Sequence, residues 1–201
     1  MRRSLSLILA VLCWFAVLTQ FVLMYQNNEI SFVATVVRFF SYFTILTNTL
    51  AAVWFTFSYI KNTILIMGKG GLTALTLYIS VVGLVYQFAL RSIWEPQGLQ
   101  MVVDELLHSV NPLCVLLFWF LFQDKQQVSW KQIPMWLIYP VAYLFYILVQ
   151  GVFTHWYPYP FLNLNVLNTG QLVRNILILV LVFVFLGSLY VGLAKIISRK
   201  N

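Results

Sequence analysis

The sequence predicts an all-α, polytopic membrane protein: a single transmembrane domain over residues 1–201, folded as a bundle of six helices with both termini in the cytoplasm. Its residues are 62% hydrophobic and 8% charged, whereas soluble globular domains carry about a quarter charged residues. Six apolar stretches provide the ~20 residues that a helix needs to cross a bilayer. The charges outside these stretches are sorted by side, which orients the bundle.

The predicted spans cover residues 4–25, 39–60, 71–90, 106–122, 132–153 and 172–196. The first span follows Arg2 and Arg3 and is longer than the ~7–15-residue core of a signal peptide, so we expect it to be retained. The second span follows the polar stretch 26–29 and enters the membrane through the polar and aromatic residues around Thr44.

The remaining spans carry signals of their own. The third ends in polar residues from Gln87 onward. The fourth contains Pro112, which leaves one carbonyl without its backbone donor and should bend the helix. The fifth contains Pro140, a second expected bend. The sixth follows the loop 154–161, whose aromatic residues and prolines are typical of a membrane interface.

The basic residues decide the predicted orientation. Nine of the twelve fall on one side of the pattern, and four of the five acidic residues fall on the other, so the first side is assigned to the cytoplasm. These nine are Arg2, Arg3, Lys61, Lys69, Lys125, Lys131, Lys195, Arg199 and Lys200. Because the cations are dispersed over loop ends, we expect them to face anionic lipid headgroups and not nucleic acid.

His108 is the most conspicuous polar residue within a predicted span. An ionisable side chain at the bilayer centre costs at least ~2.5–3.5 kcal/mol, so it requires a partner or a role. On a helix, Asp104, His108 and Asn111 follow the i, i+4, i+7 spacing and share one stripe, with Glu105 slightly to its side. We therefore expect Asp104 or Glu105 to fix the tautomer of the imidazole.

The second span carries a matching stripe of Ser41, Thr44 and Asn48, flanked by Thr47. In the predicted topology both stripes lie in the outer half of the membrane. A hydroxyl, an imidazole, carboxylates and amides at one depth are the groups that acyl transfer requires. The candidate substrate-binding residues are Ser41, Thr47, Tyr86, Gln87, His155, Tyr157 and Arg174, and Asn48, Asn111 and Arg91 are the candidate donors to an oxyanion or to a lipid carboxylate.

Each of these residues also has a purely structural interpretation. Hydroxyls in membrane helices commonly bond to their own backbone, His108 fits a solvated interfacial cluster, and arginines at the outer ends snorkel to headgroups. The stripes taken together are less easily explained in this way.

A metal site is the weaker interpretation of the same residues. Glu105 and His108 have an E-x-x-H spacing, with Asp104 and His155 as further ligands, but a catalytic zinc ion usually takes three protein ligands of suitable geometry. Glycine-rich phosphate loops, dinucleotide fingerprints and haem-ligand pairs have no counterpart in the sequence. We expect no metal and no cofactor.

The chain resembles a bacterial family of small six-span membrane proteins, mostly of unassigned function, which implies a location in the bacterial inner membrane. The segments that carry this resemblance are 40–48, Tyr78 through Tyr86, Leu106-Leu107-His108 with Pro112, Tyr139-Pro140 and 156–161. More weakly, the chain is similar to the eukaryotic androgen-induced and androgen-dependent membrane hydrolases, which cleave fatty acid esters of hydroxy fatty acids.

The similarity to these hydrolases implies two catalytic residues. Their threonine nucleophile stands in a context that Tyr42-Phe43-Thr44-Ile45 matches, and their histidine stands in one that Leu107-His108 with Pro112 matches. The chain differs from them at Leu107 and Asn111, where they tend to carry an asparagine and a second histidine. Thr44 is thus implied as the nucleophile and His108 as its base.

These observations favour an intramembrane threonine-dependent esterase that acts on a lipid ester. We expect Thr44 and His108 to approach within ~3–4 Å or to share one bridging water, and an apolar tunnel to lead from the bilayer to Thr44. Two alternatives stay open: a non-enzymatic protein that binds or senses lipid, and a small transporter or channel subunit. The scarcity of polar groups in the inner half of the spans argues against the transporter.

Overall fold

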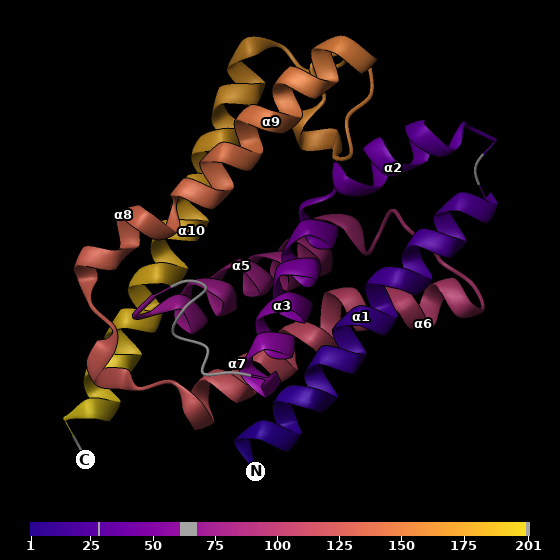
Figure 1. Cartoon of the computed structure of the whole chain (residues 1–201). Helices are drawn as coiled ribbons and strands as arrows, with labels where there is room; N and C mark the ends of the chain where they lie inside the picture. The colour runs from indigo at the N-terminus through magenta and orange to yellow at the C-terminus, as the bar shows by residue number, and fades with distance from the viewer. Residues whose placement is uncertain (28, 61–67, 200–201) are drawn as a thin grey trace. The chain divides into compact units, whose positions relative to one another are not determined.

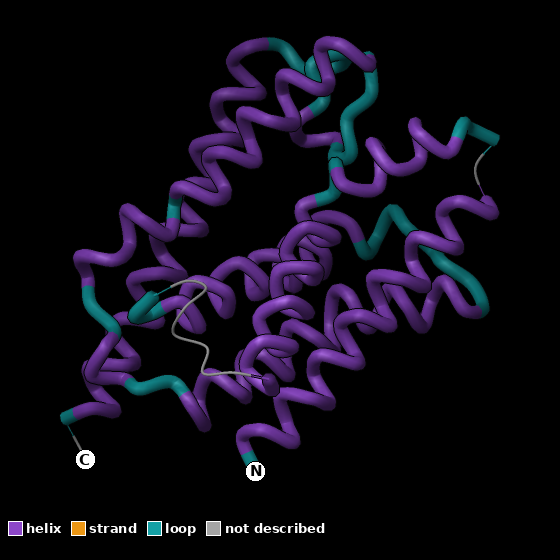
Figure 2. Tube along the Cα trace, in the orientation of Figure 1, coloured by secondary structure: helices purple, strands orange, loops and turns teal. Residues whose placement is uncertain are grey.

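The computed structural model describes residues 1–27, 29–60 and 68–199, and within these ranges the chain is helical and contains no strand (Figures 1 and 2). Two of the predicted cytoplasmic cations, Lys61 and Lys200, lie outside the described residues. The described part contains six helices long and apolar enough to cross a membrane: Arg2–Asn27, Phe43–Ile60, Gly71–Leu90, Leu99–Phe122, Trp130–Thr154 and Thr169–Ser198. The prediction of an all-α protein with six spans is confirmed.

The chain divides by its internal contacts into two compact units, Met1–Gln127 and Val128–Asn201. The first unit contains α1 (Arg2–Asn27), α2 (Phe32–Phe40), α3 (Phe43–Ile60), α5 (Gly71–Val85), the π-turn η1 (Tyr86–Leu90), α6 (Leu99–Glu105), the π-turn η2 (Leu106–Val110), α7 (Asn111–Phe122) and η3 (Lys125–Gln127). The second contains η4 (Trp130–Gln132), α8 (Ile133–Trp136), α9 (Ile138–Thr154), η5 (Pro160–Leu162) and α10 (Thr169–Ser198).

In the first unit, α5 packs against α3 and α7, and α3 packs against α1. Every residue from 71 to 79 is buried, so the first part of α5 is enclosed on all sides, and the hydroxyls of Thr73 and Thr76 within it are hydrogen-bonded. Small side chains let α1 and α3 approach closely, because Cys13 and Ala16 on one helix and Ala51 and Ala52 on the other are fully buried. This packing fixes the helix ends that carry the polar residues.

The second span begins later than predicted, at Phe43 and not at residue 39. The segment before it forms a separate short helix, α2, which ends where the Ser41 hydroxyl donates to the carbonyl of Val37 (2.7 Å). The backbone N–H groups of Ser41 and Tyr42 also bond three residues back, in a tightened last turn. Ser41 therefore lies in the turn between α2 and α3, and not on the stripe of the second span.

The fourth and fifth spans are interrupted close to their prolines. The fourth begins at Leu99, so Asp104 and Glu105 lie inside the helix, and the π-turn η2 ends at Val110, two residues before Pro112. In the fifth, helix α8 ends at Trp136 and α9 begins at Ile138. Pro140 has no N–H for the carbonyl of Trp136 and its ring crowds that carbonyl, which accounts for a break ahead of the proline.

Lys125 is not the headgroup-facing cation that the sequence analysis predicts. It is 8% exposed, and its ammonium group donates to the carbonyls of Trp119, Phe120 and Gln123 and lies 4.4 Å from the centre of a Trp119 ring. Burial lowers the pKa of Lys125, which Asp124 partly offsets. The side chain closes the carboxyl end of α7, where a cation is favoured.

Candidate active site

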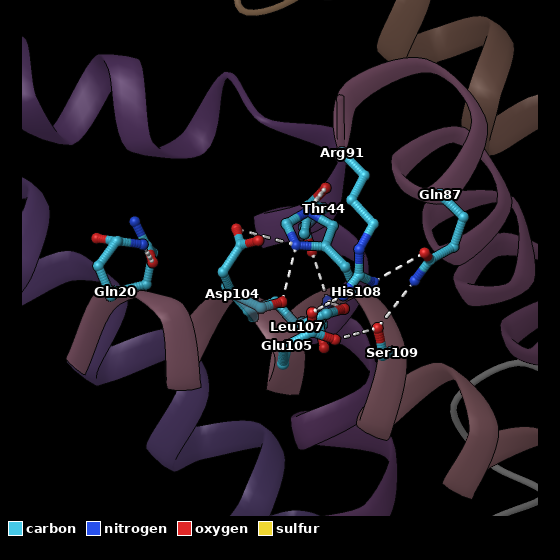
Figure 3. Close-up of polar contacts among 11 residues, drawn as sticks. Gln20, Thr44, Gln87, Arg91, Asp104, Glu105, Leu107, His108 and Ser109 are labelled. Atoms are coloured by element: carbon cyan, nitrogen blue, oxygen red, sulfur yellow. Dashed lines mark hydrogen bonds and ion pairs between the residues drawn. The ribbon is translucent and has the colours of Figure 1, made fainter. Parts of the chain in front are cut away.

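Thr44 and His108, which are implied as nucleophile and base, lie in direct contact in the first unit. Thr44 is the second residue of α3, and His108 belongs to the π-turn η2. The Oγ1 atom of Thr44 lies 3.2 Å from Nε2 of His108 (Figure 3). Thr44 is 7% exposed and the side chain of His108 is 12% exposed. The pair is thus almost enclosed, but not sealed off.

Asp104 holds the other side of the imidazole. The Nδ1 atom of His108 lies 3.0 Å from the backbone oxygen of Asp104 and 3.3 Å from its Oδ1 atom (Figure 3). Both oxygens are acceptors, so Nδ1 carries the proton and Nε2 is left to accept from the Thr44 hydroxyl. Hydroxyl, imidazole and carboxylate follow one another in the order of a catalytic triad.

The π-turn η2 changes the backbone hydrogen bonding around His108. The N–H of Asn111 bonds to Leu106, five residues back, and not to Leu107 as in an α-helix. Pro112, the next possible backbone donor, has no N–H. The carbonyl of Leu107 is therefore open to a donor from another helix. π-turns occur frequently at functional sites.

Asn48 provides that donor. Its amide nitrogen donates to the carbonyl of Leu107 (3.1 Å) and to that of Thr44 (3.0 Å), and its Oδ1 accepts from the side chain of Asn111 (2.9 Å). Both asparagines are fully buried. Since both amide protons of Asn48 are used in this way, the residue joins α3 to η2 and has no proton left for an oxyanion.

Replacing Asn48 by leucine is expected to destabilise the protein by about 2–6 kcal/mol, because the Leu107 carbonyl and the Asn111 amide lose a buried partner at about 1–3 kcal/mol each. Thermal unfolding in detergent measures the loss. Asn165→Leu is the control, since Asn165 is exposed and its side chain donates one bond, to the carbonyl of His155. An Asn48→Leu variant as stable as this control would contradict the role of Asn48 in joining α3 to η2.

A closed ring of four polar side chains connects the two π-turns, and we call it the clamp. Arg91 donates to Gln87 (2.9 Å) and to Glu105, Gln87 donates to Ser109 (3.0 Å), and Ser109 donates to Glu105 (2.6 Å) (Figure 3). Glu105 is thus engaged by Arg91 and Ser109, which leaves Asp104 as the carboxylate at His108. Arg91, a candidate oxyanion donor, is paired with Glu105.

Tyr86 stacks on His108. The two rings are 4.2 Å apart and inclined by 15°, and the Arg91 guanidinium lies 5.7 Å from the centre of the Tyr86 ring. Tyr86 is 3% exposed, so the structure places it under the imidazole and leaves almost none of it open to a ligand.

Ser41 and Thr47, two further candidates for substrate binding, are fully buried. Ser41 closes the end of α2. Burial raises the pKa of the next residue, Tyr42, and the charge of Arg38 offsets part of this rise. Neither Ser41 nor Thr47 presents surface to a substrate in this structure.

The remaining candidates, His155, Tyr157 and Arg174, belong to the second unit. His155 caps α9 in the left-handed conformation (φ 53°) and its side chain is exposed, as is that of Arg174. Tyr157 is buried over Gly151, where a β-carbon would lie 2.0 Å from its ring, and burial raises its pKa. Within this unit Tyr157 has a packing role that accounts for its position.

Ser109 and the carbonyl of Leu107 are the members of this arrangement that sequence reasoning missed. Ser109 follows His108 and lies four residues after Glu105, a spacing that brings side chains together on a helix. Pro112 likewise marks a carbonyl without a backbone donor. Both signals are present in the sequence.

The described residues contain no group of three or more His, Cys, Asp or Glu side chains that could hold a metal ion. Comparison with known proteins adds no assignment, since no family model, no curated protein and no solved structure matches the chain.

Proposed function

We propose that this protein is an intramembrane esterase that hydrolyses a lipid ester, with Thr44 as the nucleophile and His108 as the general base. The observation that carries the proposal is the 3.2 Å contact between Thr44 Oγ1 and His108 Nε2. A threonine hydroxyl is a weak nucleophile by itself, and an imidazole held in the correct tautomer is the usual means of activating one.

In the proposed reaction, Nε2 of His108 takes the proton of the Thr44 hydroxyl while Oγ1 attacks the ester carbonyl carbon. The bond to the leaving alcohol then breaks, and His108 returns the proton to the alcohol oxygen. Water, activated by the same imidazole, hydrolyses the acyl-threonine and restores Thr44. Asp104 stabilises the imidazolium that forms in each half of the reaction.

The first turn of α3 offers the donors for the oxyanion. Thr44 and Ile45 are the second and third residues of α3, and the first N–H groups of a helix have no acceptor within it. The positive end of the helix dipole also favours negative charge at this place. These amides take the role that the sequence analysis gives to Asn48, Asn111 or Arg91.

The proposed substrate class is a fatty acid ester of a hydroxy fatty acid, or a related lipid ester, on the basis of the similarity to the androgen-induced and androgen-dependent hydrolases. The proposed setting is the bacterial inner membrane, with cytoplasmic termini and the site beneath the outer headgroups. An apolar path from the bilayer to Thr44 remains a prediction.

Covalent labelling tests the proposal. A fluorophosphonate probe is expected to modify purified protein at Thr44, as mapped by mass spectrometry, and Thr44→Ala and His108→Ala are expected to abolish the adduct. Thr49→Ala is the matched control, since the Thr49 hydroxyl is on the same helix and has no partner among the described residues. A non-enzymatic lipid-binding protein has no activated hydroxyl, so a wild type that stays unlabelled while binding lipid would favour that alternative.

A further inference from the structure

Three side chains surround the imidazole of His108. Thr44 lies at Nε2, Asp104 lies at Nδ1, and Tyr86 covers the face of the ring at 4.2 Å. The first two have a chemical step in the proposed reaction. Tyr86 has none, although its ring is stacked on the imidazole and the residue is itself 3% exposed.

The clamp lies one residue beyond these side chains in the sequence. Tyr86 is followed by Gln87, Asp104 by Glu105 and His108 by Ser109. The bonds from Gln87 to Ser109 and from Arg91 to Glu105 cross between the segment that carries Tyr86 and the segment that carries His108. The same two segments are therefore held together twice, by the stacked rings and by the clamp.

Gly83 allows the two segments to come this close. A β-carbon at Gly83 would lie 3.2 Å from the backbone oxygen of His108, which is tighter than ordinary van der Waals contact, and 3.4 Å from the side chain of Pro112, at ordinary contact distance. The short approach of α5 to η2 brings the Tyr86 ring against the imidazole.

We infer that Tyr86 is a positioning residue for His108, a role that rests on the proposed function. The terminal torsion of a histidine side chain is broad, so the imidazole turns freely unless packing stops it. The flat Tyr86 ring at 15° to the imidazole holds the plane in which Nε2 faces Thr44 while Nδ1 faces Asp104. The clamp keeps the Tyr86 ring at that distance. This differs from the sequence prediction that Tyr86 binds substrate.

The kinetics of Tyr86→Phe, Tyr86→Leu and Tyr86→Met distinguish a residue that positions His108 from one that binds the substrate. Phenylalanine keeps the flat ring and loses the hydroxyl that faces Asp104, so it should retain kcat within about threefold if the ring is what holds the imidazole. Leucine and methionine should lower kcat at least about tenfold with KM within about twofold, since a small misplacement of a catalytic group costs up to about 10²-fold. Methionine fills the volume without a flat ring, so it controls for lost packing. Tyr59→Leu is the matched control, because Tyr59 lies under Arg3 (5.0 Å) and is not stacked on a histidine.

A spectroscopic measurement makes the test independent of turnover. The chain has two histidines, so His155→Gln leaves His108 as the single ¹⁵N-histidine signal in detergent micelles. We expect one Nδ1–H tautomer for the His155→Gln protein and for its Tyr86→Phe derivative, and an averaged pattern with Tyr86→Leu or Tyr86→Met.

Two results would overturn the inference: an unchanged tautomer signal in the leucine and methionine variants, or a raised KM with unchanged kcat, which would mark Tyr86 as a substrate contact. A wild type that neither hydrolyses esters nor reacts with fluorophosphonate would refute the proposed function instead. The tautomer comparison would then still decide the role of Tyr86.

Discussion

Replacing Thr44 by alanine is expected to lower the rate of lipid ester hydrolysis by at least about a thousandfold, and His108→Ala is expected to do the same. Removal of the nucleophile stops acyl transfer, and removal of the imidazole leaves a hydroxyl that is not deprotonated at neutral pH. Because the two side chains act as a unit, with Oγ1 and Nε2 3.2 Å apart, the double variant should be no slower than either single one.

The measurement is fatty acid release by purified protein in detergent or in proteoliposomes. Thr44→Ser keeps a hydroxyl and should recover part of the activity, whereas Thr49→Ala should match the wild type. Thermal unfolding shows whether each variant keeps its fold. Full turnover by both Thr44→Ala and His108→Ala on every ester that the protein cleaves would refute the assignment.

The number of spans could be predicted because hydropathy over ~20 residues depends only on composition. The start of the second span could not, since residues 39–60 read as one apolar segment, whereas the structure ends α2 at Phe40, where the Ser41 hydroxyl bonds to the carbonyl of Val37. A window average does not detect a single side-chain hydrogen bond. The same holds for the break at Leu137, where Pro140 acts on a residue that precedes it.

The π-turns could not be predicted from the sequence for a different reason. An ideal helix places Asp104, His108 and Asn111 on one stripe, but the π-turn shifts the register after Leu106. That shift is stabilised by Asn48, whose contact with Leu107 spans 59 residues of sequence. Local periodicity contains no information about such a partner, so the stripe predicted which residues share one face of the helix but not the contact that Asn111 makes with Asn48.

The choice between the two carboxylates was also undecidable from spacing. Asp104 and Glu105 lie four and three residues before His108, and both spacings permit contact on a helix. The structure distinguishes them through their other partners. Arg91 and Ser109 engage Glu105, whereas the carboxylate of Asp104 faces Tyr86 and His108, with its Oδ1 atom 3.3 Å from Nδ1 of the imidazole.

Because Asp104 and Glu105 have different partners, replacing each by its amide should change kcat by different factors. Asp104→Asn is expected to lower kcat about a hundredfold, because it removes the charge that stabilises the His108 imidazolium. The backbone oxygen of Asp104 still accepts from Nδ1 at 3.0 Å, so the loss should be smaller than the ~10⁴-fold seen when an equivalent substitution also yields the wrong tautomer. Glu105→Gln keeps hydrogen-bonding groups for the clamp and should lower kcat by less than about tenfold.

The two variants are matched, since each replaces one of two adjacent carboxylates by its own amide. Measured together with KM and thermal unfolding, they assign the carboxylate by comparison and not by an absolute rate. A larger loss in Glu105→Gln than in Asp104→Asn would reverse the assignment. Glu105, as part of the clamp, would then be the carboxylate that stabilises the charged form of His108. Equal and small losses would mean that the backbone carbonyl alone orients the imidazole, so that the site works as a pair of Thr44 and His108 without a carboxylate.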